Sequence, residues 1–154
     1  MLNQEFLKQT DLFKELTDEE LLEIILIGHV KKYKAGTHIF AEGDPGDTLY
    51  LIIEGSVRIS KMQGDTEEAL AVLDARSFFG EMTLFDRQPR SAHAIAHQQA
   101  SVFAISADAL KALFDQNKSI AYKFLWAFCL TLTSRLRSTN EKFQVIMSLA
   151  NSGF

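Results

Sequence analysis

The stretch that decides the fold runs from Thr48 to Lys61 and reads TLYLIIEGSVRISK. It contains two β-rich runs of strand length, and Gly55 stands between them. Leu49, Leu51 and Ile53 alternate with other residues, which is typical of a strand with one buried face. The stretch therefore predicts two neighbouring strands at the edge of a hydrophobic core.

The same pattern extends in both directions, from about His29 to Ile105. Glycines recur through this region, and short β-rich runs lie between them. The further runs of strand length are Glu68–Leu73, Ala92–His97 and Ser101–Ile105. Many short strands separated by turn signals predict a jelly roll or a related barrel.

Helical patterns flank this β-rich region. Thr17 and Glu20 have the spacing of a capping box, and the apolar run that follows predicts a helix ending near Gly28. On the other side, Ser106 or Asp108 is suited to cap a second helix. We therefore expect a mainly β fold with helices at both ends.

A longer helix is predicted from about Ser119 almost to the end of the chain. Its apolar positions repeat at alternating spacings of four and three, which is the heptad pattern of a coiled coil. These positions are Leu125, Cys129, Leu132, Leu136, Thr139, Phe143, Ile146 and Ala150. The seam spans roughly 39 Å at about 1.5 Å per residue, longer than the domain beside it needs. Pairing with a second subunit is the favoured interpretation, and packing along its own β-roll is the alternative.

Composition sets further limits. The chain has 154 residues, of which 47% are hydrophobic, a formal net charge of -4 and a single cysteine, Cys129. These values fit one globular domain of ordinary size and provide no positive field for nucleic acid. No secretory leader is visible, and no apolar stretch reaches the roughly 20 residues that cross a bilayer. We expect a cytoplasmic protein with no disulfide and no membrane segment.

The chemistry is concentrated between Phe78 and Ala92, which read FFGEMTLFDRQPRSA. Gly80 lets the backbone approach a ligand closely, and Arg90 offers a planar fork of donors suited to a phosphate. Between them, Glu81 to Phe85 predict one helical turn whose amides favour an anion. A carboxylate beside a phosphate site is repulsive unless it binds a donor of the same ligand. Glu81 therefore indicates a sugar phosphate.

These residues resemble the phosphate-binding cassette of the cyclic nucleotide-binding domain family. The family pattern is Phe-Gly-Glu-(apolar)-Ala-Leu, followed by Pro-Arg-(Ala, Ser or Thr)-Ala. Here it stands as Phe79-Gly80-Glu81-Met82-Thr83-Leu84 and Pro89-Arg90-Ser91-Ala92. The resemblance also covers residues 35–36, 40–47 and 49–57, and thus extends over nearly the whole chain.

The resemblance implies a jelly-roll-like, eight-stranded β-roll flanked by N-terminal helices and a long C-terminal helix. Arg90 would bind the cyclic phosphate and Glu81 the ribose 2′-hydroxyl, while Gly80, Ser91 and Ala92 would contribute backbone contacts. The remaining cassette residues, Phe79, Met82, Thr83 and Leu84, complete the implied site. Thr83 departs from the pattern, which usually has a small apolar residue there, and its hydroxyl is expected to crowd the short helix or bond to it.

Within the long helix, residues 135–142 read RLRSTNEK and resemble the dimerisation helix of the bacterial cyclic-AMP receptor proteins. That resemblance places Thr139 and Asn140 against the purine edge. It implies a nucleotide-binding unit at residues 1–118 and a dimerisation helix at 119–154. Because the helix-turn-helix of those regulators needs ~60 or more further residues, we expect no DNA-binding domain in this chain.

The sequence therefore predicts a homodimeric regulatory module that binds cyclic AMP and is not an enzyme, with no cofactor and no metal. In some relatives a hydroxyl at the position of Ser91 helps to bind guanine, so cyclic GMP is an alternative ligand. The sequence does not identify a downstream effector. One alternative is a degenerate roll that acts only as a dimerisation scaffold. Another is a cupin-like metal enzyme, for which His38 and Glu42 supply only a fragment of the ligand set. On a strand, His93 and His97 lie roughly 13 Å apart, too far to hold one metal.

Overall fold

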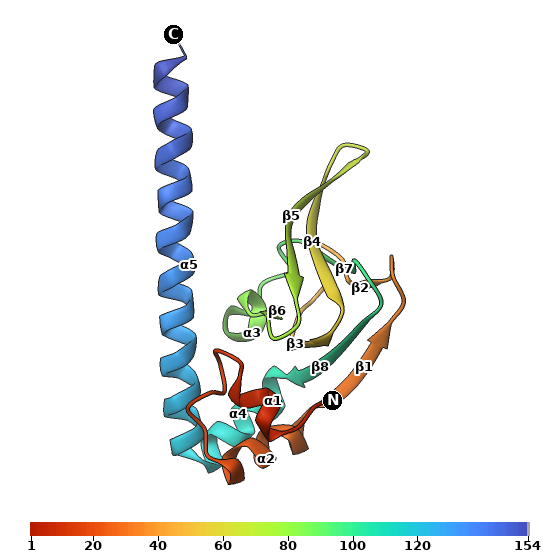
Figure 1. Cartoon of the computed structure of the whole chain (residues 1–154), viewed down its shortest axis with the longest axis vertical. Coiled ribbons are helices and arrows are strands. Elements are labelled where there is room, and N and C mark those ends of the chain that lie inside the picture. The colour runs from red at the N-terminus through yellow and green to blue at the C-terminus, as the bar shows by residue number, and fades with distance from the viewer. Residues whose placement is uncertain (154) are drawn as a thin grey trace.

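Eight strands form two four-stranded antiparallel sheets in the computed structural model, which describes residues 1–153 (Figure 1). The strands are β1 His29–Tyr33, β2 His38–Phe40, β3 Thr48–Glu54, β4 Ser56–Gln63, β5 Thr66–Asp74, β6 Phe78–Phe79, β7 His93–Ala96 and β8 Ala100–Ser106. Their orders are β1-β8-β3-β6 and β2-β7-β4-β5. The helices are α1 Gln4–Lys8, α2 Asp18–Ile27, α3 Met82–Asp86, α4 Ala107–Gln116 and α5 Lys118–Ser152. The predicted mainly β roll with N-terminal helices and a long C-terminal helix is confirmed.

The sheet that contains β3 is covered on both faces. Tyr50 and Ile52 point to the second sheet and pack with Val57. Leu49 and Leu51 point the other way, into a core shared with the helices. The prediction of one buried face was therefore wrong for β3, because the second sheet covers the Tyr50 and Ile52 side that the alternation had left to solvent.

The five predicted strand runs are all present, with ends shifted by one or two residues. Three strands had no individual prediction: β1, β2 and β6. β6 contains two residues and β2 contains three, so neither is long enough to show an alternation of its own.

The capping box that starts α2 is confirmed. The Thr17 hydroxyl accepts a hydrogen bond from the Glu20 amide at 3.3 Å, and the Glu20 carboxylate accepts one from the Thr17 amide at 2.9 Å. Glu20 also accepts a hydrogen bond from Lys123 at 2.6 Å, which fastens α2 to the start of α5.

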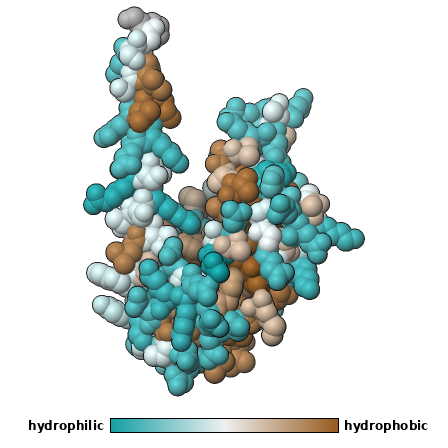
Figure 2. All heavy atoms as spheres, in the orientation of Figure 1, coloured by the Kyte–Doolittle hydropathy of each residue, from teal (hydrophilic) through white to brown (hydrophobic). Residues whose placement is uncertain are grey.

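The two halves of α5 have different surroundings. Ile120, Phe124 and Phe128 are buried in the core beside the roll. The later turns rise away from the body, and the β4–β5 hairpin stands across from them (Figure 1). Apolar side chains along this part are exposed, with 60% of Leu136 and 62% of Phe143 accessible, and Figure 2 shows an apolar patch near the end of the helix. None of the helices in residues 1–153 is long and apolar enough to cross a membrane.

Candidate functional site

A cavity of about 290 Å³ opens between the cassette, β4 and α5. Eight of the predicted site residues line it: Phe79, Gly80, Glu81, Met82, Thr83, Arg90, Ser91 and Ala92. Leu84 instead lies in the core, 5% exposed, where it fixes α3 to the body. The fold thus gathers the cassette around one concave surface.

Gly80 occupies a position that only glycine fits. Its φ is +80°, in the left-handed region that other residues rarely adopt. A Cβ here would lie 2.8 Å from the Thr48 carbonyl oxygen and 2.9 Å from Arg90 Nη1. The missing side chain therefore lets the arginine and the backbone meet.

Arg90 is the centre of the site and is 5% exposed. Its Nη1 donates to the Gly80 carbonyl at 3.0 Å and to the Thr83 hydroxyl at 2.8 Å, and its Nη2 donates to the Thr48 carbonyl at 3.0 Å. The guanidinium carbon lies 4.1 Å from the centre of the Phe40 ring. Its buried Nε has no hydrogen-bond acceptor among residues 1–153.

The charge on Arg90 is poorly compensated. Among residues 1–153 it forms no ion pair with a carboxylate, and its acceptors are two carbonyls and a hydroxyl. Burial lowers the pKa of Arg90 below its usual range, while Tyr50, Asp47 and Glu81 act in the opposite direction. Since buried charges are normally paired, the site has the electrostatics of an anion receptor.

Thr83, the departure from the family pattern, supports this arrangement. Its hydroxyl accepts from Arg90 Nη1 and lies 3.5 Å from the Gly80 carbonyl oxygen. The hydroxyl is thus bonded to the arginine and to the first turn of the cassette.

Glu81 is held by a residue that the sequence analysis did not assign to the site. Its carboxylate accepts a hydrogen bond from Arg135 Nη1 on α5 at 2.6 Å. The Arg135 guanidinium also lies 4.4 Å over the Phe78 ring. In the sequence, Arg135 begins the stretch that resembles the dimerisation helix of the cyclic-AMP receptor proteins, and that resemblance predicted no contact with residue 81.

Comparison with known proteins identifies the family. Residues 30–117, more than half of the chain, match the family model of the cyclic nucleotide-binding domain. The chain belongs to the cyclic nucleotide-binding domain family.

Its relatives include regulators of transcription. A CRP-like cAMP-activated global transcriptional regulator of Mycobacterium tuberculosis is 34% identical over 110 residues, which are 71% of this chain and 47% of that protein. The cyclic AMP receptor protein of Thermus thermophilus is 30% identical over 141 residues, 91% of this chain and 63% of that protein. A solved cyclic nucleotide-binding domain from Methylobacillus flagellatus aligns with a TM-score of 0.79 and 28% identity, covering 90% of this chain and 78% of that one. The chain thus spans about half to two thirds of the length of these curated relatives.

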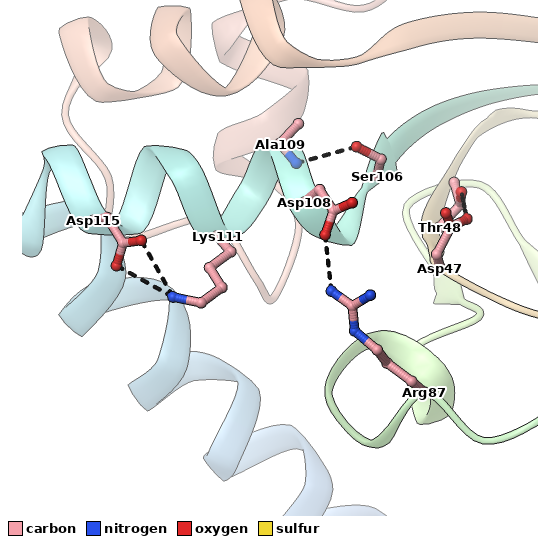
Figure 3. Close-up of polar contacts among 8 residues, drawn as sticks. All are labelled: Asp47, Thr48, Arg87, Ser106, Asp108, Ala109, Lys111 and Asp115. Carbon is pink, nitrogen blue, oxygen red and sulfur yellow. Dashed lines mark hydrogen bonds and ion pairs between the residues drawn. The ribbon is translucent and has the colours of Figure 1, made fainter.

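In this cyclic nucleotide-binding domain the cassette is also tied to α4. Arg87, which ends α3 with a φ of 54°, donates to the Asp108 carboxylate at 2.8 Å (Figure 3). Ser106 caps α4 by accepting from the Ala109 amide at 3.1 Å. Both side chains of the Arg87–Asp108 ion pair are largely exposed, so the pair contributes little to stability.

The structure places Thr139 and Asn140 farther along α5. Both are exposed, and neither lines the cassette cavity within this single chain. Their contact with the purine edge stays a prediction. The predicted dimerisation unit 119–154 includes Phe154, which lies outside the described residues.

His93 and His97 both contact other residues of the β-roll. His93 Nδ1 accepts from the Glu42 amide at 3.1 Å, and His97 Nδ1 lies 3.2 Å from Arg58 Nη1. Within residues 1–153, no three His, Cys, Asp or Glu side chains are grouped so as to hold a metal ion. The described residues therefore provide no metal-binding cluster that would support the cupin-like alternative.

Proposed function

We propose that this domain binds cyclic AMP, and cyclic GMP more weakly, as a regulatory sensor that does not transform the nucleotide. The observation that carries the proposal is the buried Arg90 guanidinium, which has no carboxylate partner among residues 1–153. A cyclic phosphate supplies the compensating charge and acceptors for a planar fork of donors.

Glu81 is the residue that favours a sugar in the ligand. Its carboxylate lines the same cavity as Arg90 and is 14% exposed, so a ribose 2′-hydroxyl can donate to it beside the Arg135 bond. Inorganic phosphate would bring its negative charge against this carboxylate, whereas a nucleotide presents a neutral hydroxyl there. The pair Arg90 and Glu81 therefore favours a nucleotide with a free 2′-hydroxyl.

The choice between adenine and guanine depends on Ser91. Ser91 lines the cavity, and its hydroxyl lies 3.5 Å from the Met82 sulfur, a weak acceptor. That hydroxyl is free to bond guanine instead, which is the specific reason to test cyclic GMP as the second candidate.

We further propose that α5 pairs with its counterpart in a second copy. The seam residues Leu132, Leu136, Phe143 and Ile146 are exposed in the single chain, which is costly for an isolated helix in water. Parallel pairing would bury them and bring two nucleotide sites beside one coiled coil. The signal would then pass from the cassette to the paired helices.

Calorimetry on matched variants tests the proposal. Arg90→Ala should weaken cyclic AMP binding by about 3–5 kcal/mol, at least a hundredfold, because it removes a buried charge-assisted contact. Glu81→Ala should cost about 1–3 kcal/mol, since a neutral hydroxyl is its partner. Arg87→Ala removes an equal charge from an exposed site at the end of α3 and should change affinity less than about threefold.

Equal affinities of the wild type and Arg90→Ala would show that the site is misplaced. Chromatography of the nucleotide after long incubation should recover it unchanged, and turnover by the pure protein would overturn the non-catalytic role. Absence of saturable heat with either nucleotide would favour the scaffold alternative.

A further inference from the structure

A second, larger cavity lies beside the cassette, and the function proposed above assigns no ligand to it. It is a groove of about 780 Å³ between α5, the turn that joins β5 to β6, and the loop after α1. In Figure 1 this is the lower part of α5, where the N-terminal segment passes close to it. We call it the Trp126 groove.

An aromatic pair forms one wall of the Trp126 groove. Tyr122 and Trp126 stack with ring centres 6.4 Å apart and planes 16° from parallel. They stay 68% and 59% exposed, and Leu130, one turn later, is 56% exposed. Neither aromatic ring is required by the hydrophobic core. A large rigid apolar surface facing a cavity is typical of a platform for a flat ligand.

One cation in the groove lacks a partner. Lys123 is paired with Glu20 at 2.6 Å and Arg135 with Glu81 at 2.6 Å, while Lys14 lies 3.8 Å from Asp11. Arg76 lines the same groove and forms no ion pair within the described part of the chain.

The backbone presents Arg76 in a fixed way. Its φ is 74°, a left-handed conformation that is uncommon for a residue with a side chain. Hydrogen bonds with Ile52 hold it there: the Arg76 amide donates to the Ile52 carbonyl at 2.8 Å, and the Ile52 amide donates to the Ser77 carbonyl at 2.9 Å. Arg76 is exposed and lines the same groove as Tyr122 and Trp126.

We propose that the Trp126 groove binds a small molecule that joins a planar aromatic ring to an anionic group. The ring stacks on Trp126, and the anion pairs with Arg76. A carboxylate and a phosphate both satisfy this chemistry, so an aromatic acid and a nucleoside phosphate are the two sources to be distinguished.

The groove shares a wall with the cassette cavity. Leu73, Phe78 and Arg135 line both spaces. Arg135 packs on Phe78 at 4.4 Å and donates to Glu81 at 2.6 Å. A ligand in the groove that moves Arg135 changes the affinity of the cassette for the nucleotide. By linkage, a bound nucleotide changes the affinity of the groove for its ligand by the same factor. This coupling, unlike the binding itself, rests on the proposed function.

The single tryptophan makes the groove directly observable, because Trp126 supplies the only indole N–H signal in a proton–nitrogen NMR spectrum. We would titrate phenylacetate and 5′-AMP as probes, with 2-phenylethanol as the neutral control. At least one anionic probe should shift the indole signal saturably, and 2-phenylethanol should bind at least tenfold more weakly than that probe. Phenylacetate alone would identify the aromatic acid as the source, and 5′-AMP alone the nucleoside phosphate.

Arg76→Asn removes the charge with a side chain that tolerates the left-handed backbone, and it should weaken the anionic probe at least tenfold. Arg137→Gln, on α5 but outside both cavities, should leave the affinity unchanged. Probe binding should persist in Arg90→Ala, which separates this inference from failure of the cassette proposal. The absence of any saturable shift, or equal probe binding by Arg76→Asn, would overturn the inference. So would an indole signal that moves with protein concentration alone, because a second copy would then occupy the groove.

Discussion

The carboxylate of Glu81 accepts a hydrogen bond from Arg135 at 2.6 Å, which joins the cassette to α5 over a separation of 54 positions in sequence. Arg135 is at the same time stacked over Phe78, so its guanidinium is oriented by two contacts. The residue that we propose for the ribose hydroxyl is therefore positioned by the helix that we propose for dimerisation. Nucleotide binding and helix position are linked at this contact.

The first prediction concerns Arg135→Met, which keeps an apolar stem over Phe78 and removes the bond to Glu81. We expect cyclic AMP to bind about tenfold more weakly, because one hydrogen bond to a charged group contributes about 1.5 kcal/mol or more. Calorimetry measures the loss. The control is Arg137→Met, the same change two positions along the helix, outside both cavities. An equal loss in both variants would mean that only net charge matters.

The sequence predicted most of what is local in this site. Residues Phe79 to Ala92 lie within one short stretch, so their grouping follows from a loop and one helical turn. The predicted turn Glu81–Phe85 is observed as Met82–Asp86, a shift of one residue.

What the sequence did not predict depends on contacts between distant elements. The role of Thr83 as an acceptor for Arg90 depends on the missing side chain of Gly80, which leaves room for the guanidinium. The bond from Arg135 to Glu81 requires knowing how α5 crosses the roll. Hydrophobic periodicity reports which face of an element is buried, and it carries no information on which side chain from another element arrives there.

A second prediction uses Cys129 to test the register of paired α5 helices. Cys129 is exposed and occupies an inner position of the seam. Parallel in-register pairing brings two copies of an inner residue close enough for a disulfide, whereas antiparallel pairing separates them. We expect mild oxidation to give a covalent dimer on a non-reducing gel.

The matched control moves the thiol to the outside of the helix. Cys129→Ser combined with Ser138→Cys keeps one cysteine per chain but places it off the seam. This variant should remain monomeric on the same gel. Equal cross-linking of both proteins would show random collisions and would remove the argument for the seam.

A third prediction concerns acid stability through Glu20. Burial by itself raises the pKa of Glu20, but hydrogen bonds from Lys123, the Thr17 amide and Ser119 lower it from 4.5 to about 2. Because the folded-state value is depressed, the carboxylate stabilises the fold above pH 4.5, and this contribution is lost as the pH falls towards 2. The loss amounts to at most about 3 kcal/mol of unfolding free energy.

Denaturant unfolding between pH 7 and pH 3 measures this contribution. Glu20→Gln should be destabilised at pH 7 and should lose less stability on acidification than the wild type. Glu19→Gln, an exposed neighbour in the same helical turn, should follow the wild-type curve. Parallel curves for Glu20→Gln and the wild type would contradict the assignment of this pH dependence to Glu20.

The last prediction concerns Thr139, the one clearly polar residue on the seam. Its hydroxyl donates to the Arg135 carbonyl at 2.9 Å, so it lies one turn beyond the residue that holds Glu81. A polar side chain at an inner position weakens pairing and sets register, and by that account Thr139→Leu strengthens the dimer and leaves nucleotide affinity unchanged.

Our account places Thr139 of one subunit, with Asn140 of the other, against the purine edge. Thr139→Leu should then preserve or strengthen dimerisation in sedimentation while weakening cyclic AMP binding in calorimetry by about tenfold, the loss of one or two hydrogen bonds. As a control, Ser138→Leu adds the same side chain off the seam and should change neither measurement. Unaltered cyclic AMP affinity in Thr139→Leu would refute the contact with the purine.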